Sequence, residues 1–65
     1  MTLTVNDKLY TTEQDTIEGF LRERGFEPRL IVVELNGEIL QRVHWDDVRL
    51  KEGDVLQMAH MVAGG

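Results

Sequence analysis

The last two residues, Gly64 and Gly65, carry the clearest chemical feature of the sequence: a terminal carboxylate on a support without side chains. A carboxylate becomes a good electrophile only when it gains a leaving group, such as the one that adenylation supplies. A reacting carboxylate that must enter another protein's active site needs a narrow support, and glycine has no Cβ. The four residues 62–65 can span about 13 Å when extended, enough to thread a channel. We therefore expect Gly65 to be the reacting residue; the alternative is an ordinary frayed terminus.

A second group of polar residues, His44, Asp46 and Asp47, has the residue types of a metal or acid–base site. The segment has no clear periodicity, and the other histidine, His60, belongs to a different predicted element. These features favour a solvated loop over a metal site. The chain has no cysteine, which excludes a cysteine nucleophile, cysteine-ligated zinc and an iron–sulfur cluster. We expect no bound metal or cofactor, and a protein that is not itself an enzyme.

Size and charge limit what the rest of the chain can do. A single domain of 65 residues buries only about 60% of the surface that its unfolded chain exposes, which leaves little room for a deep substrate pocket. The formal net charge of −5 disfavours nucleic acid and favours a basic protein surface as partner. No apolar run approaches the roughly 20 residues of a membrane span, and no signal peptide is recognisable, so a cytoplasmic location is expected.

The elements that must position the terminus begin with a hairpin. Apolar residues alternate with threonines over 1–5, which predicts a half-buried strand, and 8–12 is its expected return strand. Thr16 is a good helix N-cap, and Gly25 is placed to end the helix in a left-handed conformation. Between them, one apolar stripe at helical spacing consists of Ile17, Phe20 and Leu21.

The second half of the chain predicts another hairpin and a final strand. β-Branched residues are frequent in 30–35, Asn36-Gly37 is a strong hairpin signal, and 38–40 is the return strand. Residues 55–61 alternate again and predict the last strand. The irregular segment before it is expected to wrap the sheet edge, anchored by Trp45, Val48 and Leu50. One helix with these strands makes an α+β domain, and one helix covers only one face of the sheet.

The alternation in 55–61 assigns the side chains of the last strand to two faces. Leu56 and Met58 are expected to face the helix, whereas Gln57, Ala59 and Met61 face the open side. We predict a partner-binding patch at the root of the tail, made of Gln57, Ala59, Met61, Val62 and Ala63, which Leu30 and Val32 join if Val33 and Leu35 point inward. The predicted core comprises Met1, Leu3, Val5, Ile17, Phe20, Leu21, Val33, Leu35, Leu56 and Met58.

Several short segments, in this order and at this spacing, resemble the ThiS-type sulfur carriers of thiamine biosynthesis. They are Asp15-Thr16-Ile17, Leu35-Asn36-Gly37-Glu38-Ile39, Arg42 with Trp45, Leu50-Lys51-Glu52-Gly53-Asp54, and Val62-Ala63-Gly64-Gly65. The resemblance implies the ubiquitin-like β-grasp fold over 1–61, with the first and last strands parallel at the sheet's centre, and a free tail over 62–65.

The same resemblance implies a function and its partners. A ThiF-type adenylyltransferase uses ATP to adenylate the carboxylate of Gly65, and a sulfur donor such as a cysteine desulfurase provides for its conversion to a thiocarboxylate. Thiazole synthase (ThiG) then receives the sulfur. Two alternatives stay open from the sequence: a carrier for another pathway, such as the MoaD-type small subunit of molybdopterin synthase, and a ubiquitin-like protein modifier or interaction module.

Overall fold

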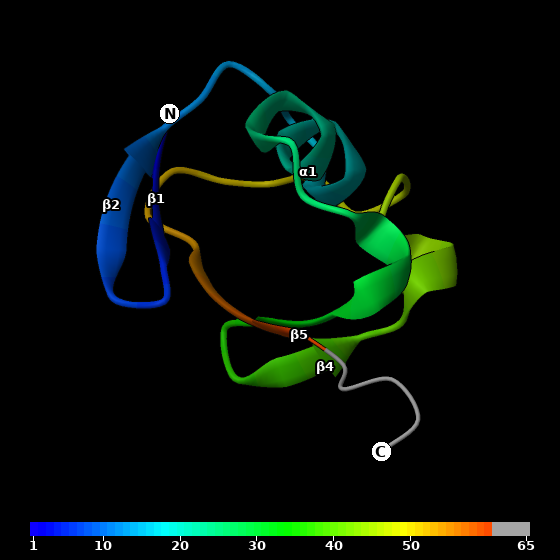
Figure 1. The fold of residues 1–65 in the computed structure, drawn as a ribbon. Helices are drawn as coiled ribbons and strands as arrows, with labels where there is room; N and C mark the ends of the chain where they lie inside the picture. The colour runs from blue at the N-terminus through cyan, green and yellow to red at the C-terminus, as the bar shows by residue number, and fades with distance from the viewer. Residues whose placement is uncertain (61–65) are drawn as a thin grey trace.

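The computed structural model describes residues 1–60. The predicted tail, 62–65, and Met61 at the end of the predicted last strand lie outside the described residues. Within them, one helix, α1 (Ile17–Arg24), lies across one face of a five-stranded sheet with the strand order β2-β1-β5-β3-β4 (Figure 1). This arrangement confirms the expected α+β class and the β-grasp layout.

The centre of the sheet is formed by the two strands that come first and last in the described chain. β1 (Thr2–Val5) pairs in parallel with β5 (Val55–His60), and β2 (Lys8–Thr11) continues antiparallel on the outer side of β1. β3 (Ile31–Leu35) is antiparallel to both β5 and the edge strand β4 (Glu38–Leu40). The parallel central pair confirms what the family resemblance implied.

The helix begins and ends where its capping residues predict. The Thr16 hydroxyl accepts a hydrogen bond from the Gly19 amide at 3.0 Å. Gly25 has φ = 77°, a left-handed conformation that glycine adopts without steric cost, and its amide donates to the Arg22 carbonyl at 3.2 Å. Both caps satisfy backbone groups that a helix end leaves without partners inside the helix.

The core lies between α1 and the sheet and contains most of the residues predicted for it. Ile31 is buried at 4% exposure although we did not predict it, whereas Met1, Leu35 and Met58 are only half-buried and pack against the core from its margin. Met58 and Leu35 pair with Val33 and Leu56, which are fully buried, so the half-buried side chains lie immediately beside the core. The buried apolar residues are Leu3, Val5, Ile17, Phe20, Leu21, Ile31, Val33, Trp45, Leu50 and Leu56.

Two short 3₁₀ helices, which we did not predict, connect the strands. The first, η1 (Pro28–Leu30), includes Leu30, so the prediction of a strand starting at Leu30 was wrong by one residue. The second, η2 (Arg42–His44), leads into Trp45, whose side chain is 3% exposed. Its indole Nε1 donates to the Leu40 carbonyl at 3.0 Å, which satisfies the polar atom of a large buried side chain. The predicted edge anchors Trp45 and Leu50 are thus confirmed, while Val48 is half-buried.

Candidate functional site

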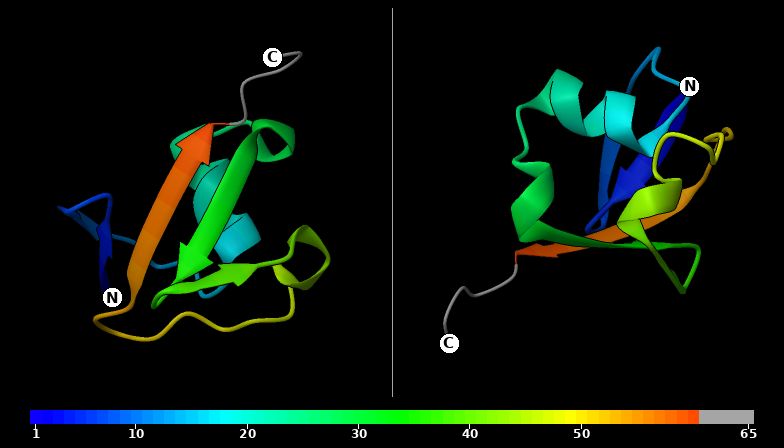
Figure 2. Two further views of the ribbon diagram at one scale, coloured as in Figure 1. Left: turned by 90° about the horizontal axis from the view of Figure 1, so that it is seen from below. Right: turned by 90° about the vertical axis from the view of Figure 1, so that its right-hand side faces the viewer.

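β5 is the strand that leads to the predicted reactive end of the chain. It lies between β1 and β3 at its start, but β1 pairs with it only through Thr4 and Val5. β3 continues alongside to His60, which pairs with Ile31 (Figure 2, left, orange and green). The end of β5 is therefore hydrogen-bonded to β3 on one side, whereas on the other side the pairing with β1 ends at Val5.

That other contact is the side chain of Asn6, in the turn between β1 and β2. Its Oδ1 accepts from the Met58 amide at 2.8 Å, and its Nδ2 donates to the Met58 carbonyl at 3.0 Å. The side-chain amide thus replaces the backbone of a neighbouring strand and extends the ladder beyond Val5. Asn6 has φ = 50° and Asp7 has φ = 69°, both within the range that two-residue hairpin turns require.

A second asparagine fixes the beginning of β5 from the opposite hairpin. Asn36, with φ = 51°, accepts a hydrogen bond from the Val55 amide at 2.9 Å through its Oδ1 and donates through its Nδ2 to Asp54 Oδ1 at 3.1 Å. The other Asp54 oxygen accepts from the Lys51 amide at 2.8 Å. Two turns from distant parts of the sequence therefore fix the strand that leads to Gly65.

The faces of β5 follow the predicted parity. Leu56 is fully buried and Met58 half-buried under the helix, whereas Gln57 and Ala59 are exposed on the open side. Val32 pairs with Ala59 and is 38% exposed, so it belongs to the same surface. Met61, Val62 and Ala63, which complete the predicted patch, lie outside the described residues.

The open side of the sheet carries more apolar side chains than we predicted. We call the outward-facing residues of the sheet the open face; its exposed residues include Leu9, Val32, Ile39, Val55, Gln57 and Ala59. Ile39 pairs with Glu34, which pairs with Gln57, and Leu9 pairs with Thr4, which pairs with Val55. The exposed fractions of Leu9, Ile39 and Val55 are 77%, 69% and 40%. Strand parity could have identified them once the register was known.

The polar residues His44, Asp46 and Asp47 are exposed to solvent. His44 Nδ1 is 3.8 Å from an Asp47 carboxylate oxygen, and both side chains are more than half exposed, as expected of a solvated loop. Throughout residues 1–60, no three histidine, cysteine, aspartate or glutamate side chains are grouped so that they could hold a metal ion. His60 is exposed on β5.

The family model named "ThiS family" matches residues 2–65, which is nearly the whole chain. The chain belongs to the ThiS family. Among curated proteins, the sulfur carrier protein ThiS of Bacillus subtilis is 30% identical over 59 residues, which are 91% of this chain and 89% of that protein. A thiazole synthase of Magnetococcus marinus is 36% identical over 50 residues, 77% of this chain but only 15% of that protein.

Solved structures of the ThiS family agree with the fold. The crystal structure of the thiamine biosynthesis protein ThiS from Geobacter metallireducens is 32% identical, has a TM-score of 0.86 and covers all of both chains. A solution structure of a thiamine biosynthesis protein from the same organism gives a TM-score of 0.76 at 32% identity, covering all of this chain and 88% of the other. Within residues 1–60, no helix has the length and apolar character of a membrane span.

Proposed function

We propose that this ThiS-family chain is a sulfur carrier of thiamine biosynthesis and that the carboxylate of Gly65 carries the sulfur. The similarity to the sulfur carrier of Bacillus subtilis over 91% of the chain is the observation that supports this most. β5, fixed by the two asparagine turns, is the last described element before Gly64 and Gly65 in the sequence. In this proposal the folded domain binds the partner, and residues 62–65 enter the partner's active site. The chain is then a co-substrate rather than an enzyme.

The chemistry takes place in two steps at the Gly65 carbonyl. A ThiF-type adenylyltransferase supplies the site in which a carboxylate oxygen attacks the α-phosphorus of ATP, which forms the acyl-adenylate and releases pyrophosphate. A sulfur nucleophile then attacks the acyl carbon, so that a C–S bond forms as the C–O bond to AMP breaks. With hydrosulfide as nucleophile the product is the thiocarboxylate itself, and the proton goes to solvent. In the cell, a cysteine desulfurase is the proposed source of the sulfur.

The protein that receives the sulfur is, in this proposal, a thiazole synthase. Part of a thiazole synthase from Magnetococcus marinus is similar to 77% of this chain, although the match covers 15% of that protein. A carrier-like segment within the sequence of such an enzyme supports a working association between the two. ATP is consumed by the adenylating partner, the chain itself binds no cofactor, and we place these reactions in the cytoplasm.

The open face is the proposed docking surface for these partners. Val32 and Ala59 lie together near the end of β5, and Gln57 adds a polar group that can donate and accept hydrogen bonds. We propose that Met61, Val62 and Ala63 continue this surface toward the tail. An apolar surface with a few polar groups is typical of a protein interface.

The intact mass of the chain tests the proposal directly. The protein is incubated with ATP, a ThiF-type adenylyltransferase and hydrosulfide, and we expect the mass to show replacement of one oxygen by sulfur. Without ATP the mass stays unchanged. If neither the adenylate nor the sulfur exchange forms under conditions that activate the Bacillus subtilis carrier, the proposed function is wrong.

A further inference from the structure

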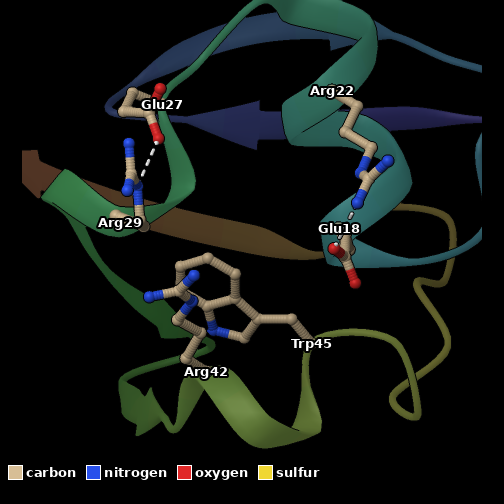
Figure 3. Close-up of a pocket in the computed structure, with 6 residues that line it drawn as sticks. All are labelled: Glu18, Arg22, Glu27, Arg29, Arg42 and Trp45. Carbon is tan, nitrogen blue, oxygen red and sulfur yellow. Dashed lines mark hydrogen bonds and ion pairs between the residues drawn. The ribbon is translucent and has the colours of Figure 1, made fainter.

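A polar pocket with a volume of about 220 Å³ lies on the helix side of the domain, between α1, η1 and η2. Figure 3 shows its residues around three sides: two from α1, two from η1 and the residue before it, and two from η2 and the residue after it. Sites for small-molecule ligands usually measure roughly 300–1,000 Å³. This pocket therefore fits one side chain better than a nucleotide. It is lined by Glu18, Arg22, Glu27, Arg29, Arg42 and Trp45.

The charges around the pocket are unusual for this chain. Three arginines and two glutamates give the lining a net charge of +1, whereas the whole chain has −5. Arg22 pairs with Glu18 at 3.0 Å, and Arg29 pairs with Glu27 at 3.2 Å. Arg42 makes no ion pair with any residue of the described range 1–60. Among the described residues, the Arg42 guanidinium is thus the one at the pocket without a paired carboxylate.

Trp45 holds Arg42 in place and gives the pocket one apolar side. The Trp45 amide donates to the Arg42 carbonyl at 3.1 Å, while the buried indole is itself bonded to Leu40. The backbone that carries Arg42 is therefore fixed to the core. Arg42 itself is exposed, so its guanidinium is accessible to a partner.

The pocket also lies close to the end of β5. Arg29 is two residues before Ile31, and Ile31 pairs with His60, the last described residue of that strand. Figure 2 (right) shows η1 directly beside the end of the orange strand β5. A protein that takes up the chain end after His60 therefore comes within reach of the pocket.

We propose that this pocket receives the carboxylate of an aspartate or glutamate side chain from the adenylating partner, with Arg42 as its main ligand. A carboxylate matches the planar fork of a guanidinium, which binds two oxygens at once. A single negative charge balances the lining, whereas a doubly charged phosphate meets repulsion from Glu18 and Glu27. The pocket adds orientation to an encounter that the overall negative charge steers toward a basic partner surface. This inference rests on the proposed function, because it identifies how the adenylating partner recognises the chain.

Charge reversal at Arg42, with a matched control, tests the proposal. Arg42→Glu changes the net charge by −2, and so does Lys8→Glu on β2, an exposed residue that does not line the pocket. The readout is the KM for the chain in ATP–pyrophosphate exchange by the ThiF-type adenylyltransferase. We expect Arg42→Glu to raise the KM at least about tenfold with kcat little changed, and Lys8→Glu to change it in either direction by less than about threefold. Arg42→Lys keeps the charge but loses the fork and is expected to lie between them.

The outcomes separate the two proposals. Thermal melts of the variants, expected to match the unmodified chain, show that any change in KM is not due to unfolding. Equal KM values for Arg42→Glu and Lys8→Glu would show that only the net charge matters and would overturn the pocket proposal, while the proposed function stands. An unmodified chain that supports no pyrophosphate exchange would instead contradict the proposed function, and the pocket proposal with it.

Discussion

The two faces of the sheet are built from the same strands but differ in how far their side chains are buried. On the helix side, Leu3, Val33 and Leu56 are fully buried. On the open face, the neighbouring residues Val32 and Val55 are 38% and 40% exposed. Because side chains alternate along a strand, β5 contributes Leu56 and Met58 to the core side and Val55, Gln57 and Ala59 to the accessible surface.

This difference divides stability from recognition. Apolar residues on the helix side remove surface from water on folding and contribute about 25 cal/mol per Å² of buried apolar area. The apolar residues of the open face remain in water and contribute less to folding, so a partner that covers them gains that burial on binding. Substitutions on the two faces should therefore have opposite consequences for stability and for activation.

The largest loss of stability is expected from Leu56→Ala. Leu56 is fully buried, and truncating such a leucine usually costs about 2–5 kcal/mol. The neighbouring substitution Gln57→Ala, on the exposed side, should cost less than about 0.5 kcal/mol. Urea unfolding followed by circular dichroism measures both values. Equal losses at the two positions would show that the division between the faces is wrong.

A smaller loss is expected when a turn releases β5. Asn36→Gly keeps the left-handed backbone but removes the side-chain bonds to Val55 and Asp54, so that part of a nearly buried carboxylate loses its partner. Leaving such a group without its hydrogen bond costs about 1–3 kcal/mol. Asn36→Ala should cost more, because φ = 51° also strains alanine. A glycine variant as stable as the unmodified chain in urea unfolding would show that the side-chain bonds contribute nothing.

The smallest effect on stability is expected on the open face. Val32→Thr keeps the shape of an exposed side chain and should cost less than about 0.5 kcal/mol. Its control is Val33→Thr, which buries a hydroxyl in the core and should cost about 1–3 kcal/mol. In ATP–pyrophosphate exchange by the adenylyltransferase, however, we expect Val32→Thr to raise the KM for the chain several-fold with kcat unchanged. An unchanged KM would remove Val32 from the proposed docking surface.

Local signals in the sequence were enough to predict most of the elements. Thr16 and Gly25 define the ends of α1 because the capping chemistry acts within one turn of the helix. Alternation predicted the burial of Leu56 and the exposure of Gln57 and Ala59 for a similar reason: the period of a strand is a local property. The central parallel pair, β1 and β5, came only from the family resemblance, since no local pattern encodes a pairing of distant strands.

Long-range contacts were beyond the reach of the sequence alone. The bond from Asn6 to Met58 joins residues 52 positions apart, and the bond from Asn36 to Val55 joins residues 19 positions apart. The sequence marks Asn36 as a turn former, and Asn6 lies between the two strands of the predicted first hairpin, but neither feature identifies the strand that the side chain fixes. The pocket at Arg42 has the same origin, since its lining comes from three separate segments.

The central claim is that the domain presents the terminal carboxylate of Gly65 and that this group alone carries the sulfur. The most direct test is the intact mass, after incubation with ATP, adenylyltransferase and hydrosulfide, of the full chain and of a variant without Gly64 and Gly65. Glycine has no side chain to bury, so the melting temperature should stay nearly unchanged and serves as the folding control. We predict exchange of oxygen for sulfur in the full chain and none in the shortened chain, whose carboxylate lies two residues farther back on Ala63. A shortened chain that melts normally and still gains sulfur would contradict the account.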